Sequence, residues 1–105
     1  MLSITEHAKL KTYIKGVDVA RVAGAFDALS EPKRCLIFRA LLKQKTVNVS
    51  QLAQALNISE SLASQHLKIL QQAGLVEKQR QGKNVYYHVN RHDKLVGALQ
   101  KAVEV

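Results

Sequence analysis

Residues 59–74 read SESLASQHLKILQQAG, and this stretch decides the fold. Ser59 is a favourable helix N-cap, because its hydroxyl can accept a hydrogen bond from a free amide of the first turn. Gly74 is a favourable helix stop, because glycine readily adopts the left-handed conformation that ends many helices. The residues between them, Glu60 to Ala73, are therefore predicted to form one helix.

At about 100° per residue this helix separates into two faces. One arc holds the apolar side chains and one histidine: Leu62, Ala63, His66, Leu67, Ile69, Leu70 and Ala73. The other arc holds hydroxyls, amides and one cation, without a carboxylate: Ser61, Ser64, Gln65, Lys68, Gln71 and Gln72. A merely solvated face is expected to mix Glu with Lys, whereas side chains that donate and accept suit base edges and phosphates. The polar arc is therefore predicted to bind DNA.

The residues before this helix complete a helix-turn-helix. Residues 49–56, VSQLAQAL, make two to three helical turns that end at Asn57, and Ile58 is the apolar residue that pins the short turn. Residues 43–48 are a polar connector. The second helix of such a motif enters the major groove, so residues 49–73 are predicted to be the helix-turn-helix.

After Gly74 the apolar residues recur at every second position, which indicates a β-hairpin over residues 75–90. Val76 lies on the first run, residues 81–84 form the polar tip, and alternating apolar residues mark the second run: Val85, Tyr87 and Val89. Basic residues surround the tip, with Glu77 as the one nearby carboxylate: Lys78, Arg80, Lys83 and Arg91. The hairpin is predicted to be a wing that lies along the DNA backbone or the minor groove. Of Tyr86 and Tyr87, only one can point outward, which favours packing over a nucleobase platform.

The remaining segments predict further helices. Residues 1–30 contain two helical stretches: residues 4–14 mix polar and apolar side chains, and the stretch from Val19 to Leu29 is amphipathic. Ser30, Glu31 and Pro32 then form the start of a core helix that extends to Leu41 or Leu42. Residues 93–105 form a last amphipathic helix, with apolar residues on one side: Leu95, Ala98, Leu99 and Ala102. The predicted fold is mostly α with a β-hairpin wing, a dimeric winged helix-turn-helix in one domain of residues 1–105.

The apolar stripes of residues 1–30 and 93–105 stay partly uncovered if residues 49–90 close a core around the middle helices. Such stripes are normally buried by a partner. The sequence therefore predicts a C2 homodimer built from these two terminal segments.

Composition agrees with a compact DNA-binding protein. Sixteen Lys and Arg against eight Asp and Glu give a formal net charge of +8, which favours a polyanionic partner. Hydrophobic residues make up 47% of the chain, but no apolar run reaches the roughly 18 to 20 residues of a membrane span. The N-terminus lacks the apolar block of a signal peptide. We therefore expect a cytoplasmic protein without a membrane partner.

Five blocks in order, covering about residues 24–90, carry a specific pattern: ALSEPKR (28–34), VSQLA (49–53), SESLASQHLKIL (59–70), AGLV (73–76) and GKNVYY (82–87). Together they resemble the ArsR/SmtB family of winged-helix repressors. The resemblance implies a dimer that represses an operon from a palindromic operator in double-stranded DNA and releases it when an inducer binds. It carries base reading to Ser61, Ser64 and Gln65, and wing contacts to Arg80 and Lys83. With Lys68 and Lys78 these are the predicted DNA-binding residues.

The resemblance does not supply a metal site. Family members that sense thiophilic metals carry Cys-x-Cys where this chain has residues 47–50, VNVS. The family's zinc-site positions correspond to Arg91, Asp93 and Glu104, and Arg91 would repel a cation. His88, His92 and Asp93 are close in sequence, but such loose donors are usually solvated. We therefore predict no metal and no cofactor, and the inducer stays open between another ligand, a modification of Cys35 and regulation by abundance alone.

Two single residues allow two interpretations each. His66 lies within the apolar arc, where a packed, hydrogen-bonded histidine is favoured over a ligand. Cys35 is favoured as a buried structural thiol, although Lys33 and Arg34 could lower its pKa and make it reactive if it were exposed. One cysteine excludes an internal disulfide and a cysteine-based zinc knuckle.

Two other classes of function compete with a DNA-binding regulator. A winged-helix protein-interaction module without direct DNA reading would enrich aromatic and aliphatic anchors on the exposed helix face, and here that face is Ser and Gln. An enzyme requires a nucleophile and base or clustered carboxylates at a defensible spacing, and the sequence offers neither. The chain is therefore predicted not to be an enzyme.

Overall fold

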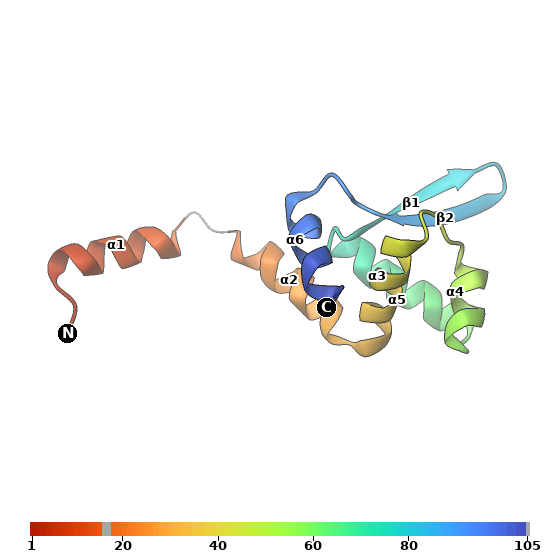
Figure 1. Ribbon diagram of the computed structural model, residues 1–105, viewed down its shortest axis with the longest axis horizontal. Coiled ribbons are helices and arrows are strands. Elements are labelled where there is room, and N and C mark those ends of the chain that lie inside the picture. Colours follow the sequence, from red (N-terminus) through yellow and green to blue (C-terminus); the bar gives the residue numbers. More distant parts are fainter. Residues whose placement is uncertain (16–17, 105) are drawn as a thin grey trace.

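The computed structural model describes residues 1–15 and 18–104. Helices and one hairpin follow one another as shown in Figure 1: α1 (Ile4–Ile14), α2 (Val19–Ser30), α3 (Pro32–Lys43), α4 (Val49–Leu56), α5 (Glu60–Gln72), β1 (Val76–Gln81), β2 (Asn84–Val89) and α6 (Lys94–Val103). This arrangement confirms the predicted winged helix-turn-helix. The last predicted helix extended to Val105, which lies outside the described residues.

The core forms where α3 and α5 meet the base of the hairpin. Its fully buried larger side chains come from α3, α5, β1, β2, α6 and the residue before β1: Ile37, Phe38, Leu41, Leu67, Leu70, Leu75, Val76, Val89 and Val96. Helix α5 packs against α2, α3, α4 and β1. It is therefore held from several sides, and only its remaining face is free.

Local side-chain contacts fix both helices of the helix-turn-helix. Helix α4 begins with a capping box, in which the Asn48 side chain accepts from the Gln51 amide at 2.8 Å and the Gln51 side chain accepts from the Asn48 amide at 3.0 Å. It ends at Asn57, whose φ of 54° lies in the left-handed region. Ser59 then caps α5 by accepting from the Leu62 amide at 3.0 Å, as predicted.

Two glycines with positive φ fix where the hairpin starts and where it turns. Gly74 has a φ of +77° and ends α5, where the Leu75 amide donates back to the Leu70 carbonyl at 3.0 Å. Gly82 has a φ of +61°, which suits the first central position of a two-residue type II′ turn between Gln81 and Asn84. The predicted tip therefore lies where the strands turn.

Residues 43–48, before α4, were predicted to be a polar connector, and this prediction is wrong for Val47. Val47 is buried and exchanges two backbone hydrogen bonds with Tyr87 of β2, at 2.9 and 3.2 Å. This bridge adds a short third segment to the hairpin. It ties the start of the helix-turn-helix to the wing.

Three arginines satisfy groups that the folding of the chain would otherwise leave unpaired. Arg34 donates to the Ala28 carbonyl at the end of α2 at 2.7 Å. Arg91 donates to the carbonyls of Leu41 and Leu42 at the end of α3, at 3.3 and 3.1 Å. Because the last carbonyls of a helix have no partner within it, these contacts stabilise both helix ends.

The third arginine joins α2 to α6. Arg21 pairs with Asp93 at 2.5 Å, and the other Asp93 oxygen caps α6 by accepting from the amides of Leu95 and Val96. The Val96 amide first, and then the Arg21 guanidinium, hold the pKa of Asp93 below its ordinary value. Asp93 is therefore a structural residue that positions the last helix.

Asp93→Ala should lower the Tm by about 5 °C near neutral pH, because it removes an N-cap and the partner of Arg21. A depressed folded-state pKa gives stability that is present above the unfolded pKa and lost as the pH falls through the folded value. The difference in Tm between variant and wild type should therefore shrink in thermal scans taken from pH 6 down to pH 3.

Asp27→Ala is the matched control, because Asp27 is exposed on α2 and its side chain makes no hydrogen bond or ion pair within residues 1–15 and 18–104. It should change the Tm by less than about 1 °C. Equal Tm values for Asp93→Ala and Asp27→Ala would contradict the structural role of Asp93.

Candidate nucleic-acid interface

The polar face of α5 is exposed to solvent. The opposite side of the helix is buried through Ala63, Leu67 and Leu70, each with no exposed surface. With those three side chains held in the core, the helical period turns the polar arc outward. All six of its members are exposed: Ser61, Ser64, Gln65, Lys68, Gln71 and Gln72.

The border of this face differs from the prediction. The helical period predicts that Leu62 and Ile69 lie on the apolar arc that faces the core, yet their side chains are 36% and 37% exposed. At the helical period, both flank the polar arc on the side of Gln65. The exposed face of the helix is therefore polar with an apolar margin.

His66 lies on the inner side of α5 and is buried, as predicted, at 8% exposure. Its Nδ1 atom has no hydrogen-bond partner among the described residues and lies 3.9 Å from a carboxylate oxygen of Glu31. Glu31 caps α3 by accepting from the Arg34 amide at 2.9 Å, and this hydrogen bond is the main reason that the pKa of Glu31 is lowered. The predicted hydrogen bond of His66 is thus missing at Nδ1, and the ring instead faces the corner between α2 and α3.

The wing presents its basic residues on one face. Lys78 pairs with Tyr87 and Arg80 with Val85, so both basic residues lie on the hairpin face that packs on the helices at its base. Both are exposed, and Lys83 is exposed at the turn. Figure 1 shows that the hairpin and α4 lie at the same end of the molecule, away from α1. A positive strip therefore extends from the body toward the tip.

The other wing face is different in character. It carries Glu77 and His88, whose side chains approach to 3.0 Å, and the half-buried Tyr86. Tyr87 is buried on the inner face, where burial raises the pKa of its hydroxyl. The two tyrosines thus alternate, as predicted, and Tyr87 serves in packing.

The donors considered for a metal do not gather into a site. His88 is paired with Glu77, whereas Asp93 is bound to Arg21 and to the start of α6. No group of three or more His, Cys, Asp or Glu side chains with metal-binding geometry occurs in the part of the chain that the structure describes. Arg91, at one of the family's zinc-site positions, is instead used to cap α3.

Cys35 is half-buried rather than buried, so its predicted burial was wrong for the single chain. It lines an apolar groove of about 550 Å³ between α2, α3 and α6, together with Phe26, Leu29, Ser30, Arg39, Leu99, Ala102 and Val103. Phe26 is 59% exposed at this groove. The predicted burial assumed that the chain by itself covers the Cys35 thiol. Because the groove that Cys35 lines is open in the single chain, the thiol stays partly exposed.

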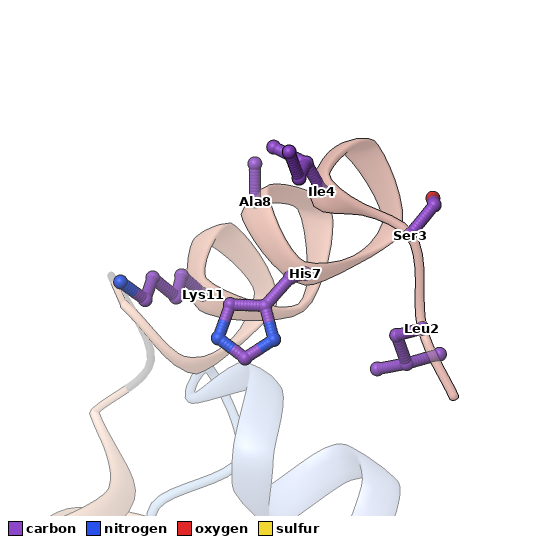
Figure 2. A pocket seen from close by; sticks show the side chains of 6 residues that line it. All are labelled: Leu2, Ser3, Ile4, His7, Ala8 and Lys11. Atoms are coloured by element: carbon purple, nitrogen blue, oxygen red, sulfur yellow. The ribbon is translucent and has the colours of Figure 1, made fainter.

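A second hollow of about 320 Å³ lies along α1 (Figure 2). Its lining comes from this helix and the residues just before it: Leu2, Ser3, Ile4, His7, Ala8 and Lys11. One helix cannot enclose a ligand, and every side chain of residues 1–15 is exposed. The hollow therefore marks a helix without a packing partner in the single chain.

Comparison with known proteins places this geometry in a family. The protein-family model described as "Bacterial regulatory protein, arsR family" matches residues 31–78 of this chain. Nodulation protein NolR of Rhizobium meliloti is 36% identical over 87 residues, which cover 81% of this chain and 70% of NolR. The chain belongs to the ArsR family. This membership confirms the predicted DNA-binding transcriptional regulator.

Other relatives of this chain support the same assignment to a family of transcriptional regulators. A transcriptional repressor SmtB homologue of Synechocystis is 34% identical over 88 residues, covering 83% of this chain and 66% of that protein. HlyU from Vibrio cholerae superposes with a TM-score of 0.73 at 26% identity, covering 84% of this chain and 92% of HlyU. The SmtB homologue is named as a transcriptional repressor. Within the described residues, no helix is long and apolar enough to cross a membrane.

The ArsR-family chain should purify without stoichiometric metal, and micromolar zinc should leave its Tm unchanged. Coordination requires three or four donors that converge within about 2.0 to 2.3 Å of the ion, and His88 and Asp93 are already engaged elsewhere. Elemental analysis and thermal scans with and without zinc measure this. One tightly held zinc ion per subunit, lost in His88→Ala or His92→Ala, would overturn the prediction.

Proposed function

We propose that this ArsR-family protein acts as a homodimeric repressor that places one α5 helix in each half of a palindromic operator. The observation that carries the proposal is the exposed, carboxylate-free polar face between Ser61 and Gln72, held outward by the buried side of the same helix. Side chains that both donate and accept match the mixed edges of base pairs in the major groove. Release of the operator then depends on a signal that acts on the dimer.

The proposed DNA contacts fall into two classes. Ser61, Ser64 and Gln65 lie in the first half of α5, which is the part of a recognition helix that reaches base edges. Lys68 and the wing residues supply charge for phosphates: Lys78, Arg80 and Lys83. The helix thus supplies sequence preference, and the basic residues supply most of the affinity, which depends on salt.

The proposed dimer uses the terminal segments, residues 1–30 and 93–105, around the helix-turn-helix (49–73) and wing (75–90). The open apolar groove beside Phe26 supports it, because an exposed patch of this kind is normally covered. Helix α1 has 11 residues and none is buried, and an isolated helix of this length is marginal in water. A second copy can cover both features and set two α5 helices one DNA turn apart, roughly 34 Å.

Ser64→Ala or Gln65→Ala should weaken discrimination between the selected operator and random DNA by about 1 to 3 kcal/mol, because each removes a base-edge contact. Arg80→Ala and Lys83→Ala are the matched controls on the wing. They should weaken binding to both DNAs alike and reduce the salt dependence. Binding isotherms on both DNAs at several salt concentrations measure both effects.

Full sequence preference in both α5 variants would show that α5 does not read the operator. Sequence preference lost in the wing variants, with α5 variants unaffected, would move the reading site to the wing. In either case the proposed role of Ser64 and Gln65 fails.

Phe26→Glu should convert the dimer into a monomer at micromolar concentration, because a charge placed in a buried apolar interface is left without a partner. Leu62→Glu is the matched control, since Leu62 is exposed on α5 and does not line the groove. Sedimentation velocity on wild type and both variants measures the outcome. A wild-type monomer, or a Phe26→Glu dimer of unchanged stability, would exclude this interface.

A further inference from the structure

Leu62 is an apolar side chain left at the surface of the helix that reads DNA. It is 36% exposed, whereas its neighbour Ala63 is fully buried. Its backbone is fixed, because the Leu62 amide donates to the Ser59 hydroxyl that caps α5. Leu62 therefore stands at a defined position in the first turn, with part of its side chain not covered by the protein.

The place of Leu62 on the helix puts it among the proposed reading residues. It precedes Gln65 by three positions, and side chains three apart on a helix are neighbours. It also follows Ser61 directly. Ser61 and Leu62 are about 100° apart around the helix, so the nearness of Leu62 to the proposed reading residues comes from Gln65. A duplex engaged by Gln65 therefore lies beside the exposed part of Leu62.

The chemistry of the major groove limits what Leu62 can contact favourably. Base edges there present hydrogen-bond donors and acceptors, and an apolar side chain pressed on them removes water without replacing its hydrogen bonds. The exception is thymine, whose C5 methyl group is the apolar feature of the groove. Contact between this methyl group and a leucine removes apolar surface of both from water.

We infer that Leu62 is a specificity-determining residue that selects a thymine, through its C5 methyl group, next to the base read by Gln65. The inference rests on the proposed function, because it requires α5 to lie in the major groove. Ile69 has nearly the same exposure, 37%, but lies two helical turns further from the N-terminus of α5. The first turns of a recognition helix reach furthest to the bases, so Leu62 carries this role.

The test uses the full-length protein and an operator selected in vitro from random duplexes. Each thymine is replaced in turn by deoxyuridine, which keeps the base pair and removes only the methyl group. For wild type, one such replacement per half-site should weaken binding about three- to fivefold, the size expected for burial of one methyl group. Leu62→Ala should bind the thymine and deoxyuridine operators equally.

Ile69→Ala is the matched control and should retain the wild-type response to deoxyuridine. Leu62→Thr provides a second variant; its smaller side chain should give a weaker response than wild type, and thermal scans confirm that both variants fold. Equal binding of wild type to every deoxyuridine operator would overturn the inference. An unchanged response in Leu62→Ala would overturn it as well.

These outcomes are separable from the failure of the proposed function. If Gln65→Ala relaxes sequence preference but deoxyuridine has no effect, α5 reads DNA and only the role of Leu62 is wrong. If wild type shows no preference between selected and random DNA, both proposals fail together.

Discussion

The burial of one side of α5 determines which face of this helix the molecule presents to a partner. Ala63, Leu67 and Leu70 are fully buried, and each leucine contributes about 1.5 to 3 kcal/mol relative to an exposed one. Rotating α5 to hide its polar face would expose these residues. Because the helical period links the two faces, the energy that stabilises the core also holds Ser61, Ser64 and Gln65 in solvent.

Some of the cationic side chains behind the net charge of +8 make structural contacts, and others do not. Arg34 and Arg91 cap helix ends, and Arg21 is paired with Asp93. The composition alone cannot separate these arginines from Lys68 and the wing residues, because all contribute equally to the charge count. Positions on the fold make the distinction: Lys68 is exposed on α5, and Lys78 and Arg80 are exposed along one face of the hairpin. Other exposed cations lie on α1, α3 and α6, so the charge is not confined to the proposed DNA-binding face.

The elements of the fold could be predicted because local signals agreed: helical and alternating periods, Ser59 and Gly74 at the ends of α5, and Gly82 at the turn. The bridge between Val47 and Tyr87 could not, since it joins residues 40 positions apart and one pair leaves no periodic pattern. The exposure of Leu62 was missed for another reason. A helical wheel gives the direction of a side chain but not how far the neighbouring helices extend, so residues at the border of the apolar arc are undetermined.

The groove beside Phe26 and helix α5 share supporting elements. Helices α2 and α3 line the groove, and both also pack against α5. Their corner holds Glu31, which lies 3.9 Å from Nδ1 of the buried His66 on α5, and Arg21 ties α2 to the start of α6. A close-packed interior transmits small displacements rather than absorbing them. The elements that line the groove are therefore the same elements that hold the polar face of α5 toward solvent.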